Sequence, residues 1–238
     1  MDEPALWDML GLPGGIGVSR LRVYDTPAVD GLVGGTPHMH LCCAEGYLVT
    51  GGAGAVHTLA TGGYAETPLR PGVVAWFPPG TIHRLVNDGG LEIVVLMQNS
   101  GLPEAGDAVF PFPSHVLADP EKYAVAAAAA DARTHHARRD LAVEGFQHLR
   151  EMVKRDGPGG LDGFHVAAAA LVRPHLDRWR QRWLAGARAA AEATGRHLTA
   201  LAEGDHTHLR GGGIFALPEP TERGRRGMCG VLDTYQTG

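Results

Sequence analysis

The sequence predicts a β-sandwich or β-barrel followed by an α-helical region. Glycine and proline divide the chain: residues 1–119 contain 19 Gly and 11 Pro, residues 120–203 contain 7 and 3, and residues 204–238 contain 8 and 2. In the first part, short apolar or β-branched segments alternate with Gly and Pro turns about every 8–12 residues, which is typical of sandwiches and barrels. The low-Gly, Ala-rich middle part has the composition of helices.

Six segments of the first part are expected to be strands. Each is bounded by turn signals, for example the Gly51-Gly52 and Gly89-Gly90 pairs. The expected strands are residues 18–24, 47–50, 55–59, 73–77, 83–86 and 91–97.

The helical part begins where Asp119 can cap a helix that has Pro120 at its first position. This helix is expected to run to about residue 155, with an interruption near Gly145. Further helices are expected at residues 161–172 and, opened by Pro174, to about residue 203. The predicted organisation is an N-terminal segment (1–14), a barrel (15–113), a helical extension (114–203) and a Gly-rich tail (204–238) that can act as a lid.

Charge and cysteine content exclude several classes of protein. The net charge is −5, and the basic residues do not form the patch that nucleic-acid binding requires. The three cysteines, Cys42, Cys43 and Cys229, are too few for a disulfide framework. The first residues lack a signal-peptide pattern, and no apolar run is long enough to span a membrane. A cytoplasmic protein that binds neither nucleic acid nor membrane is therefore expected.

Two histidine motifs carry the chemistry. His38 and His40 project to the same face of a strand because the side-chain period of a strand is two. Glu45 begins the next strand and can reach the same point, and His83 can be a fourth member. Imidazole and carboxylate groups that converge in this way suit one divalent transition metal (Fe, Mn, Ni, Co or Zn), whose identity the sequence leaves open.

These motifs resemble those of the cupins. The first cupin motif is a glycine, five residues, His-x-His, three or four residues, Glu, six residues and Gly; this chain departs from it only at the leading glycine, where Leu32 stands. The second is Gly, five residues, Pro-x-Gly, two residues, His, three residues and Asn. The matching positions are His38, His40, Glu45 and Gly52 in the first motif and Gly72, Pro78, Gly80, His83 and Asn87 in the second.

The resemblance implies a cupin barrel (double-stranded β-helix, or jelly roll) with a metal held by His38, His40, Glu45 and His83. It leads us to expect a metal-dependent enzyme that acts on a small organic substrate, in the first place a mononuclear non-haem dioxygenase or other oxidoreductase. A non-redox isomerase, epimerase, decarboxylase or lyase acting on a sugar or sugar acid is one alternative, and a non-catalytic ligand-binding cupin is another. Cupins frequently form dimers, so a homodimer is expected.

Further candidates lie on or beside the expected strands. Glu45 can accept a proton during catalysis, and His57 can act as an acid or base because its ordinary pKa lies near neutral pH. Taken alone, His57 and each of the pocket candidates is expected to be a packing or surface residue. The candidates for the substrate pocket are Tyr47, Trp76, Arg84 and Gln98.

Three features lie outside this set. Cys42 and Cys43 fall between two predicted ligands but are expected to be small packing residues. The tail sequence Asp205-His206-Thr207-His208 repeats the His-x-His spacing and is expected to be a solvated loop. Arginines 223, 225 and 226 are expected to form an exposed basic tail, and they can clamp an anionic substrate if the tail folds over the mouth of the barrel.

Overall fold

In the computed structural model, which describes residues 12–129 and 131–235, the chain forms an antiparallel β-barrel followed by a series of helices. This confirms the predicted fold class, a β-barrel with a C-terminal helical region. Residues 1–11 of the predicted N-terminal segment lie outside the described residues.

All the strand pairs are antiparallel, and the main path of the sheet runs β4-β3-β6-β1-β9-β8. The short strand β2 pairs with β6 and β7, and β5 pairs with β3. The strands are β1 (Gly17–Val23), β2 (His38–His40), β3 (Glu45–Ala60), β4 (Gly63–Leu69), β5 (Val74–Phe77), β6 (Ile82–Met97), β7 (Ala108–Val109), β8 (Glu222–Arg226) and β9 (Gly230–Tyr235).

Strands β3 and β6 each join two of the expected segments into one long strand. The join in β3 is irregular, because the register against β6 shifts between Val49 and Gly54. Gly52 has a φ of +69°, and a Cβ there would lie 2.1 Å from Gly90 O, so the chain needs a glycine at this bulge. The bulge exchanges the two faces of β3: Tyr47 and Val49 face the barrel interior before it, and Val56 faces it afterwards.

The Gly-rich tail is part of the sheet. Strand β9 pairs with β1 along its whole length, and β8 pairs with β9. Cys229 is buried in the core of the barrel, and Leu232 packs against that core. The end of the tail is therefore a fixed hairpin of the barrel.

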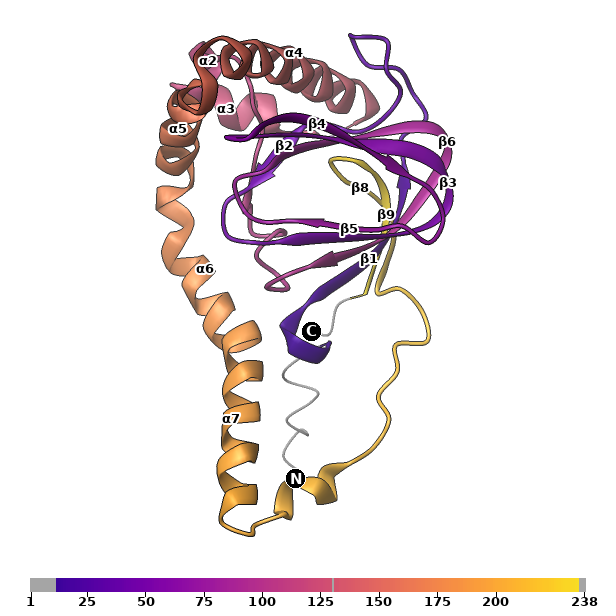
Figure 1. The fold of residues 1–238 in the computed structure, drawn as a ribbon, viewed down its shortest axis with the longest axis vertical. Helices are drawn as coiled ribbons and strands as arrows, with labels where there is room; N and C mark the ends of the chain where they lie inside the picture. The colour runs from indigo at the N-terminus through magenta and orange to yellow at the C-terminus, as the bar shows by residue number, and fades with distance from the viewer. Residues whose placement is uncertain (1–11, 130, 236–238) are drawn as a thin grey trace.

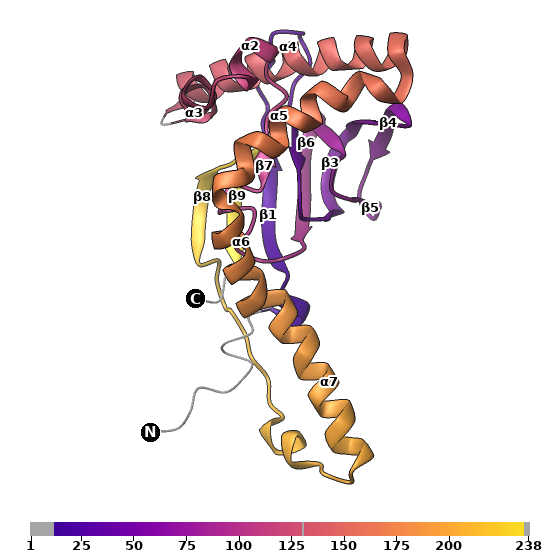
Figure 2. The same ribbon diagram turned by 90° about the vertical axis from the view of Figure 1, so that its left-hand side faces the viewer.

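The helices form a second layer. Helix α4 lies across one end of the barrel, and α5, α6 and α7 continue one another down its side (Figure 1 and Figure 2). A second apolar core lies between the barrel and these helices. The helices are α2 (Ser114–Leu117), α3 (Pro120–Ala127), α4 (Ala132–Asp156), α5 (Asp162–Val172), α6 (Leu176–Trp183) and α7 (Ala189–Ala202), with shorter helical turns η1 (Pro13–Gly15), η2 (Gly157–Leu161), η3 (Arg173–His175), η4 (Leu184–Arg188) and η5 (Thr207–Gly211).

The expected start of the helical part is confirmed, because the Asp119 carboxylate accepts hydrogen bonds from Glu121 N and Lys122 N. The helical chain is interrupted between α3 and α4, whereas Gly145 lies within an unbroken α4. A Cβ at Gly145 would lie 1.7 Å from Pro111 O, so this glycine is needed for close packing.

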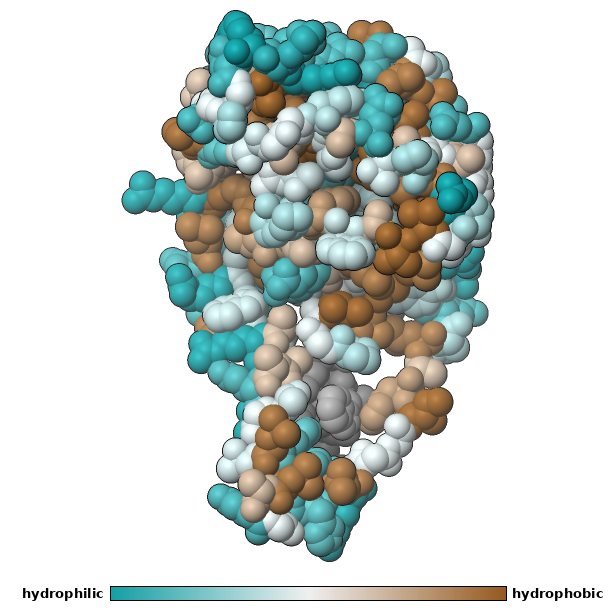
Figure 3. All heavy atoms as spheres, in the orientation of Figure 1, coloured by the Kyte–Doolittle hydropathy of each residue, from teal (hydrophilic) through white to brown (hydrophobic). Residues whose placement is uncertain are grey.

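Helix α7 and the turn η5 extend beyond the barrel (Figure 1). Apolar side chains are exposed on this projecting part, where the space-filling view shows brown spheres among teal ones (Figure 3). The exposed apolar residues are Leu198, Leu201, Leu209, Ile214 and Phe215. In the described residues, no helix is long and apolar enough to cross a membrane.

Candidate metal centre

The two histidine motifs meet inside the barrel. His38 and His40 lie at the two ends of β2, and Glu45 is the first residue of β3. His83 lies on β6 directly opposite His38 in the antiparallel pair. The four side chains are buried, and each offers a ligand atom within 4.8 Å of the others. The cluster can therefore hold a metal ion.

The ring nitrogens of the cluster point at one another. His83 Nε2 lies 3.1 Å from His38 Nε2 and 3.1 Å from Glu45 Oε2. His40 Nε2 lies 3.3 Å from the same carboxylate oxygen. Glu45 Oε2 nevertheless has no well-oriented hydrogen-bond partner.

In His38 and His83, the hydrogen bond made by Nδ1 shows that this ring nitrogen carries a hydrogen. His38 Nδ1–H donates to Thr36 O at 2.9 Å, and His83 Nδ1–H donates to Thr81 O at 3.2 Å. A carbonyl oxygen only accepts, so both Nδ1 atoms carry a hydrogen, and in the neutral rings both Nε2 atoms present lone pairs. Two lone pairs at 3.1 Å beside a carboxylate repel one another, and a proton on one Nε2 or a bound metal cation relieves that repulsion. The donor set of three imidazoles and one carboxylate therefore fits a divalent transition metal.

The surroundings shift the pKa of His38, His40 and Glu45. Burial, together with His83 and His40, holds the pKa of His38 well below its usual range. Burial opposes the charged form of Glu45, but His83 and His40 outweigh it and hold the pKa of this carboxyl well below its usual range. Burial also disfavours a charged His40, yet Asp107 and Glu45 raise its pKa to about 9. Metal binding at neutral pH must therefore displace a proton from His40.

Asp107 lies beside His40 Nδ1, the ring nitrogen that does not face Glu45. Its side chain is fully buried, and Oδ1 accepts hydrogen bonds from Leu41 N (3.2 Å) and Cys42 N (2.8 Å). This leaves Oδ2 facing His40 Nδ1 at 3.4 Å. A carboxylate in this position keeps the proton on Nδ1 and turns Nε2 toward the metal position. Asp107 lies far from the other residues of the cluster along the chain and belongs to neither motif, so no sequence pattern indicates its role.

A cavity of about 660 Å³ opens from the cluster. His38, His40 and Glu45 form part of its lining. Barrel strands, helices α3, α4 and α5, and the hairpin β8–β9 supply the other walls, which are mainly apolar. The apolar residues include Val18, Leu21, Val95, Met97, Val109, Phe110, Tyr123, Leu171, Val172, Met228 and Leu232.

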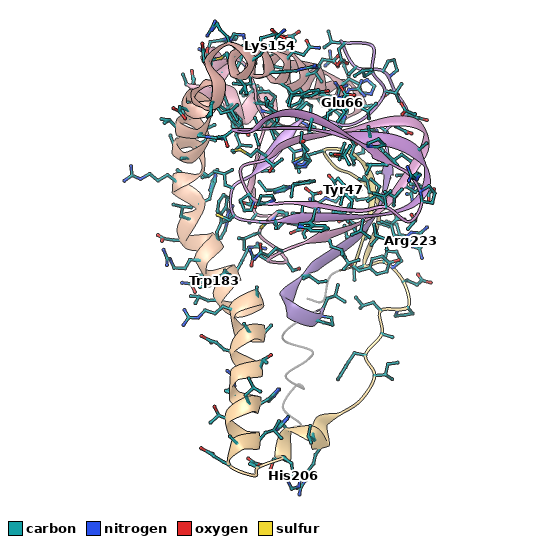
Figure 4. All side chains as sticks on the ribbon, in the orientation of Figure 1. Tyr47, Glu66, Lys154, Trp183, His206 and Arg223 are labelled. Atoms are coloured by element: carbon teal, nitrogen blue, oxygen red, sulfur yellow. The ribbon has the colours of Figure 1, made fainter. Side chains whose placement is uncertain are left out.

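The structure does not bring the other candidate residues into this cavity lining. Tyr47 lies inside the barrel (Figure 4), where its hydroxyl is buried without a hydrogen-bond partner and burial raises its pKa well above the usual range. Trp76 is 76% exposed. Arg84 forms a buried ion pair with Asp30, and Gln98 Oε1 accepts a hydrogen bond from Ala44 N.

His57 lies outside the barrel interior because it follows the bulge in β3. Its Nδ1 lies 2.9 Å from Tyr64 Oη, beneath helix α4, where Arg150 stacks on the Tyr64 ring. Glu66, which accepts a hydrogen bond from Tyr64 Oη, lies on the same side (Figure 4). Burial lowers the pKa of His57. The structure therefore separates His57 from the metal ligands.

The remaining sequence features fall in three places. Cys42 is exposed and Cys43 buried, and burial raises the pKa of both thiols. His206 lies at the far end of the projecting part, remote from the cluster (Figure 4). Arg225 and Arg226 line the cavity.

Comparison with known proteins gives limited similarity. No protein-family model matches this chain, and no curated protein matches it. Solved structures match part of it. An oxalate oxidase is 23% identical over 43% of this chain and 54% of its own, with a TM-score of 0.32. A predicted oxalate decarboxylase from Thermotoga maritima is 22% identical over 34% of this chain and 64% of its own, with a TM-score of 0.27.

The capsular polysaccharide assembling protein CapF from Staphylococcus aureus is 22% identical over 39% of this chain and 26% of its own, with a TM-score of 0.32. The chain thus spans less than two thirds of the length of each of these three solved structures. Similarity at this level assigns no activity.

Proposed function

We propose that this protein is a metal-dependent enzyme that acts on a small organic molecule, and that it is a mononuclear non-haem dioxygenase or related oxidoreductase. The observation that carries the proposal is the convergence of His38, His40, Glu45 and His83 at a cavity of about 660 Å³. Cavities of this volume are typical of sites for small organic ligands.

A bound iron or similar metal would supply the capacity to activate dioxygen and to polarise a coordinated oxygen of the substrate. A metal held by His38, His40, Glu45 and His83 would keep coordination positions for a substrate or dioxygen. The apolar walls bind the body of the substrate and exclude water from the reacting atoms. The Glu45 carboxylate, held ionised by its neighbours, can accept a proton at Oε2.

The lining also carries the kind of group that a non-redox reaction would need. Isomerases, epimerases and lyases need an acid or base beside the reacting carbon. In the part of the chain that the structure describes, Glu104 and His175 are the lining residues outside the cluster that carry a carboxylate or an imidazole. If the reaction is not oxidative, one of these two groups is the expected base.

The experiment is anaerobic purification, metal analysis by mass spectrometry, and measurement of oxygen consumption with catechol-, enol- and sugar-type substrates. We expect iron and substrate-dependent oxygen uptake, both of which are lost in His83→Ala and kept in His206→Ala at the far end of the projecting part. Zinc or nickel without oxygen uptake, but with turnover, would favour the non-redox enzyme. Metal binding without turnover of any substrate would favour a ligand-binding protein. The homodimer and the cytoplasmic location stay predictions.

A further inference from the structure

Arg138 of helix α4 is a cation without an anionic partner in the wall of the cavity. Its Nη1 donates to Ala127 O and its Nη2 to Gly227 O, both at 3.3 Å, and its guanidinium lies 4.9 Å above the Phe110 ring. Its Nε is buried without a hydrogen-bond partner. Among the described residues, no carboxylate pairs with it. A half-buried charge in this situation favours the binding of an anion from outside the chain.

The hairpin β8–β9 brings further positive charge to the same cavity. Gly227 O, at the turn of the hairpin, also accepts hydrogen bonds from His135 Nε2 (2.8 Å) and Tyr24 Oη (3.1 Å). These bonds tie the turn to helix α4 and to the strand β1 side of the barrel. Arg226, one residue earlier, is therefore held at the cavity, and it has no carboxylate partner among residues 12–129 and 131–235.

The neighbouring Arg225 lines the cavity too, but it already lies 3.7 Å from Glu222 in an ion pair. Burial raises the pKa of the Tyr24 hydroxyl, whereas the positive charges of Arg226 and Arg138 partly oppose this shift. The guanidinium groups of Arg138 and Arg226, neither of which has a carboxylate partner among the described residues, thus lie on the same side of the cavity, around the hairpin turn. Burial lowers the pKa of Arg138, as expected for a guanidinium that lacks a counter-ion.

We propose that the substrate is an organic acid with an apolar body, and that Arg138 and Arg226 bind its carboxylate. The apolar walls between the arginines and the cluster accommodate the body, so the reacting end faces His38, His40 and Glu45. This inference rests on the proposed function for the reaction, and on Arg138 and Arg226 alone for the charge of the substrate. A guanidinium is suited to this role because its donors match the two oxygens of a carboxylate.

The test uses two probes of the same shape that differ in charge, 4-phenylbutyrate and 4-phenylbutyramide. Their affinities are measured by isothermal titration calorimetry on the full chain, with and without zinc, which takes part in no redox step. We expect the acid to bind at least about tenfold more tightly than the amide. Arg226→Gln should weaken binding of the acid about tenfold and leave the amide unchanged, since it removes one charged pair.

Arg138→Gln should also weaken binding of the acid and leave the amide unchanged. If this substitution in α4 disturbs folding, Arg226→Gln still tests the proposal, because Arg226 is exposed. Arg223→Gln is the matched control, because Arg223 lies on the same strand, pairs with Glu219 at 3.2 Å and is absent from the cavity lining. Equal or absent binding of the two probes, or acid binding that survives both substitutions, would overturn the proposal.

Metal content and oxygen uptake of the same preparations separate this inference from the proposed function. Selective binding of the acid by a protein without metal or turnover would keep the anion site and remove the enzyme. Metal-dependent turnover without preference for the acid would keep the enzyme and remove the anion site.

Discussion

The substitution Asp107→Asn tests whether the buried carboxylate sets the protonation of His40. Asp107 Oδ1 accepts from Leu41 N and Cys42 N, and Oδ2 faces His40 Nδ1. In the asparagine variant, the amide oxygen must keep the position that accepts from the two main-chain groups. Its NH₂ group then faces His40 Nδ1 and donates to it. The proton of the neutral ring moves to Nε2, which can no longer bind a metal.

The expected loss of metal affinity is about 10–100-fold, which is the effect typical of removing a partner that orients a metal-binding histidine. It corresponds to about 1.4–2.7 kcal/mol of binding free energy. The folded state should lose little stability, because the asparagine keeps both hydrogen bonds to the main chain. Asp107→Ala removes those two bonds and should lower the free energy of unfolding by about 1 kcal/mol for each bond.

Competition titration of zinc against a chromophoric chelator measures the affinity, and urea unfolding of the metal-free protein measures the stability. Asp233→Asn is the control, because Asp233 pairs with Arg22 at 2.9 Å and does not line the cavity. The reasoning is refuted if Asp107→Asn binds zinc within about twofold of the unsubstituted protein, or if its affinity falls only together with its stability.

Three further outcomes follow from the structure. His83→Ala should reduce bound metal from about one ion per chain to near zero, as mass spectrometry can show, because one of four ligands is lost; full metal content would contradict the assigned ligand set. Burial lowers the pKa of His135 to about 4, against 6.5 in the unfolded chain, so its contribution to stability is complete above pH 6.5 and is lost as the pH falls toward 4, by at most about 3 kcal/mol. Urea unfolding at pH 7 and pH 4.5 should show a smaller change with pH in His135→Gln, and equal changes would refute this. Gly145→Ala should lower the free energy of unfolding by about 1–3 kcal/mol, because its Cβ meets Pro111 O, whereas Gly163→Ala in α5, with open space around it, should raise it by up to about 1 kcal/mol.

The convergence of His38, His40 and Glu45 could be predicted because local geometry determines their placement. Residues 38 and 40 share one face of any strand, and the turn before Glu45 is short. The position of His83 depended on the resemblance, since only the pairing of β2 with β6 brings it opposite His38. The structure adds the hydrogen bonds to Thr36 O and Thr81 O, which main-chain geometry sets and no side-chain pattern reveals.

The face of β3 on which His57 lies could not be predicted. Counting in steps of two from Glu45 places residue 57 on the inner face, but the register shift between Val49 and Gly54 exchanges the faces. The Gly51-Gly52 pair predicts a turn between two strands, whereas in the structure β3 continues through both residues. A bulge is determined by pairing with the neighbouring strand, so it has no reliable local signal.

The tail hairpin had no strand signal either. Strand β8 has the sequence Glu-Arg-Gly-Arg-Arg, and all five residues are exposed. It is extended because it pairs with β9, which in turn pairs with β1 at the other end of the chain. Pairing over such a separation along the chain depends on the finished barrel, not on local propensity.

The His/Glu cluster and the charged walls of the cavity come from different parts of the chain. The four ligands come from residues 38–83 of the barrel, whereas Arg138 comes from α4 and Arg226 from the tail. A metal site set within a barrel can serve many reactions, so the fold alone does not select the substrate. The helices and the hairpin add the walls that we propose surround the substrate and supply its charge partners. Substitutions that change the choice of substrate without loss of metal should therefore fall at lining residues within 120–175 and 225–234, and substitutions that abolish metal binding should fall at the ligands and at Asp107.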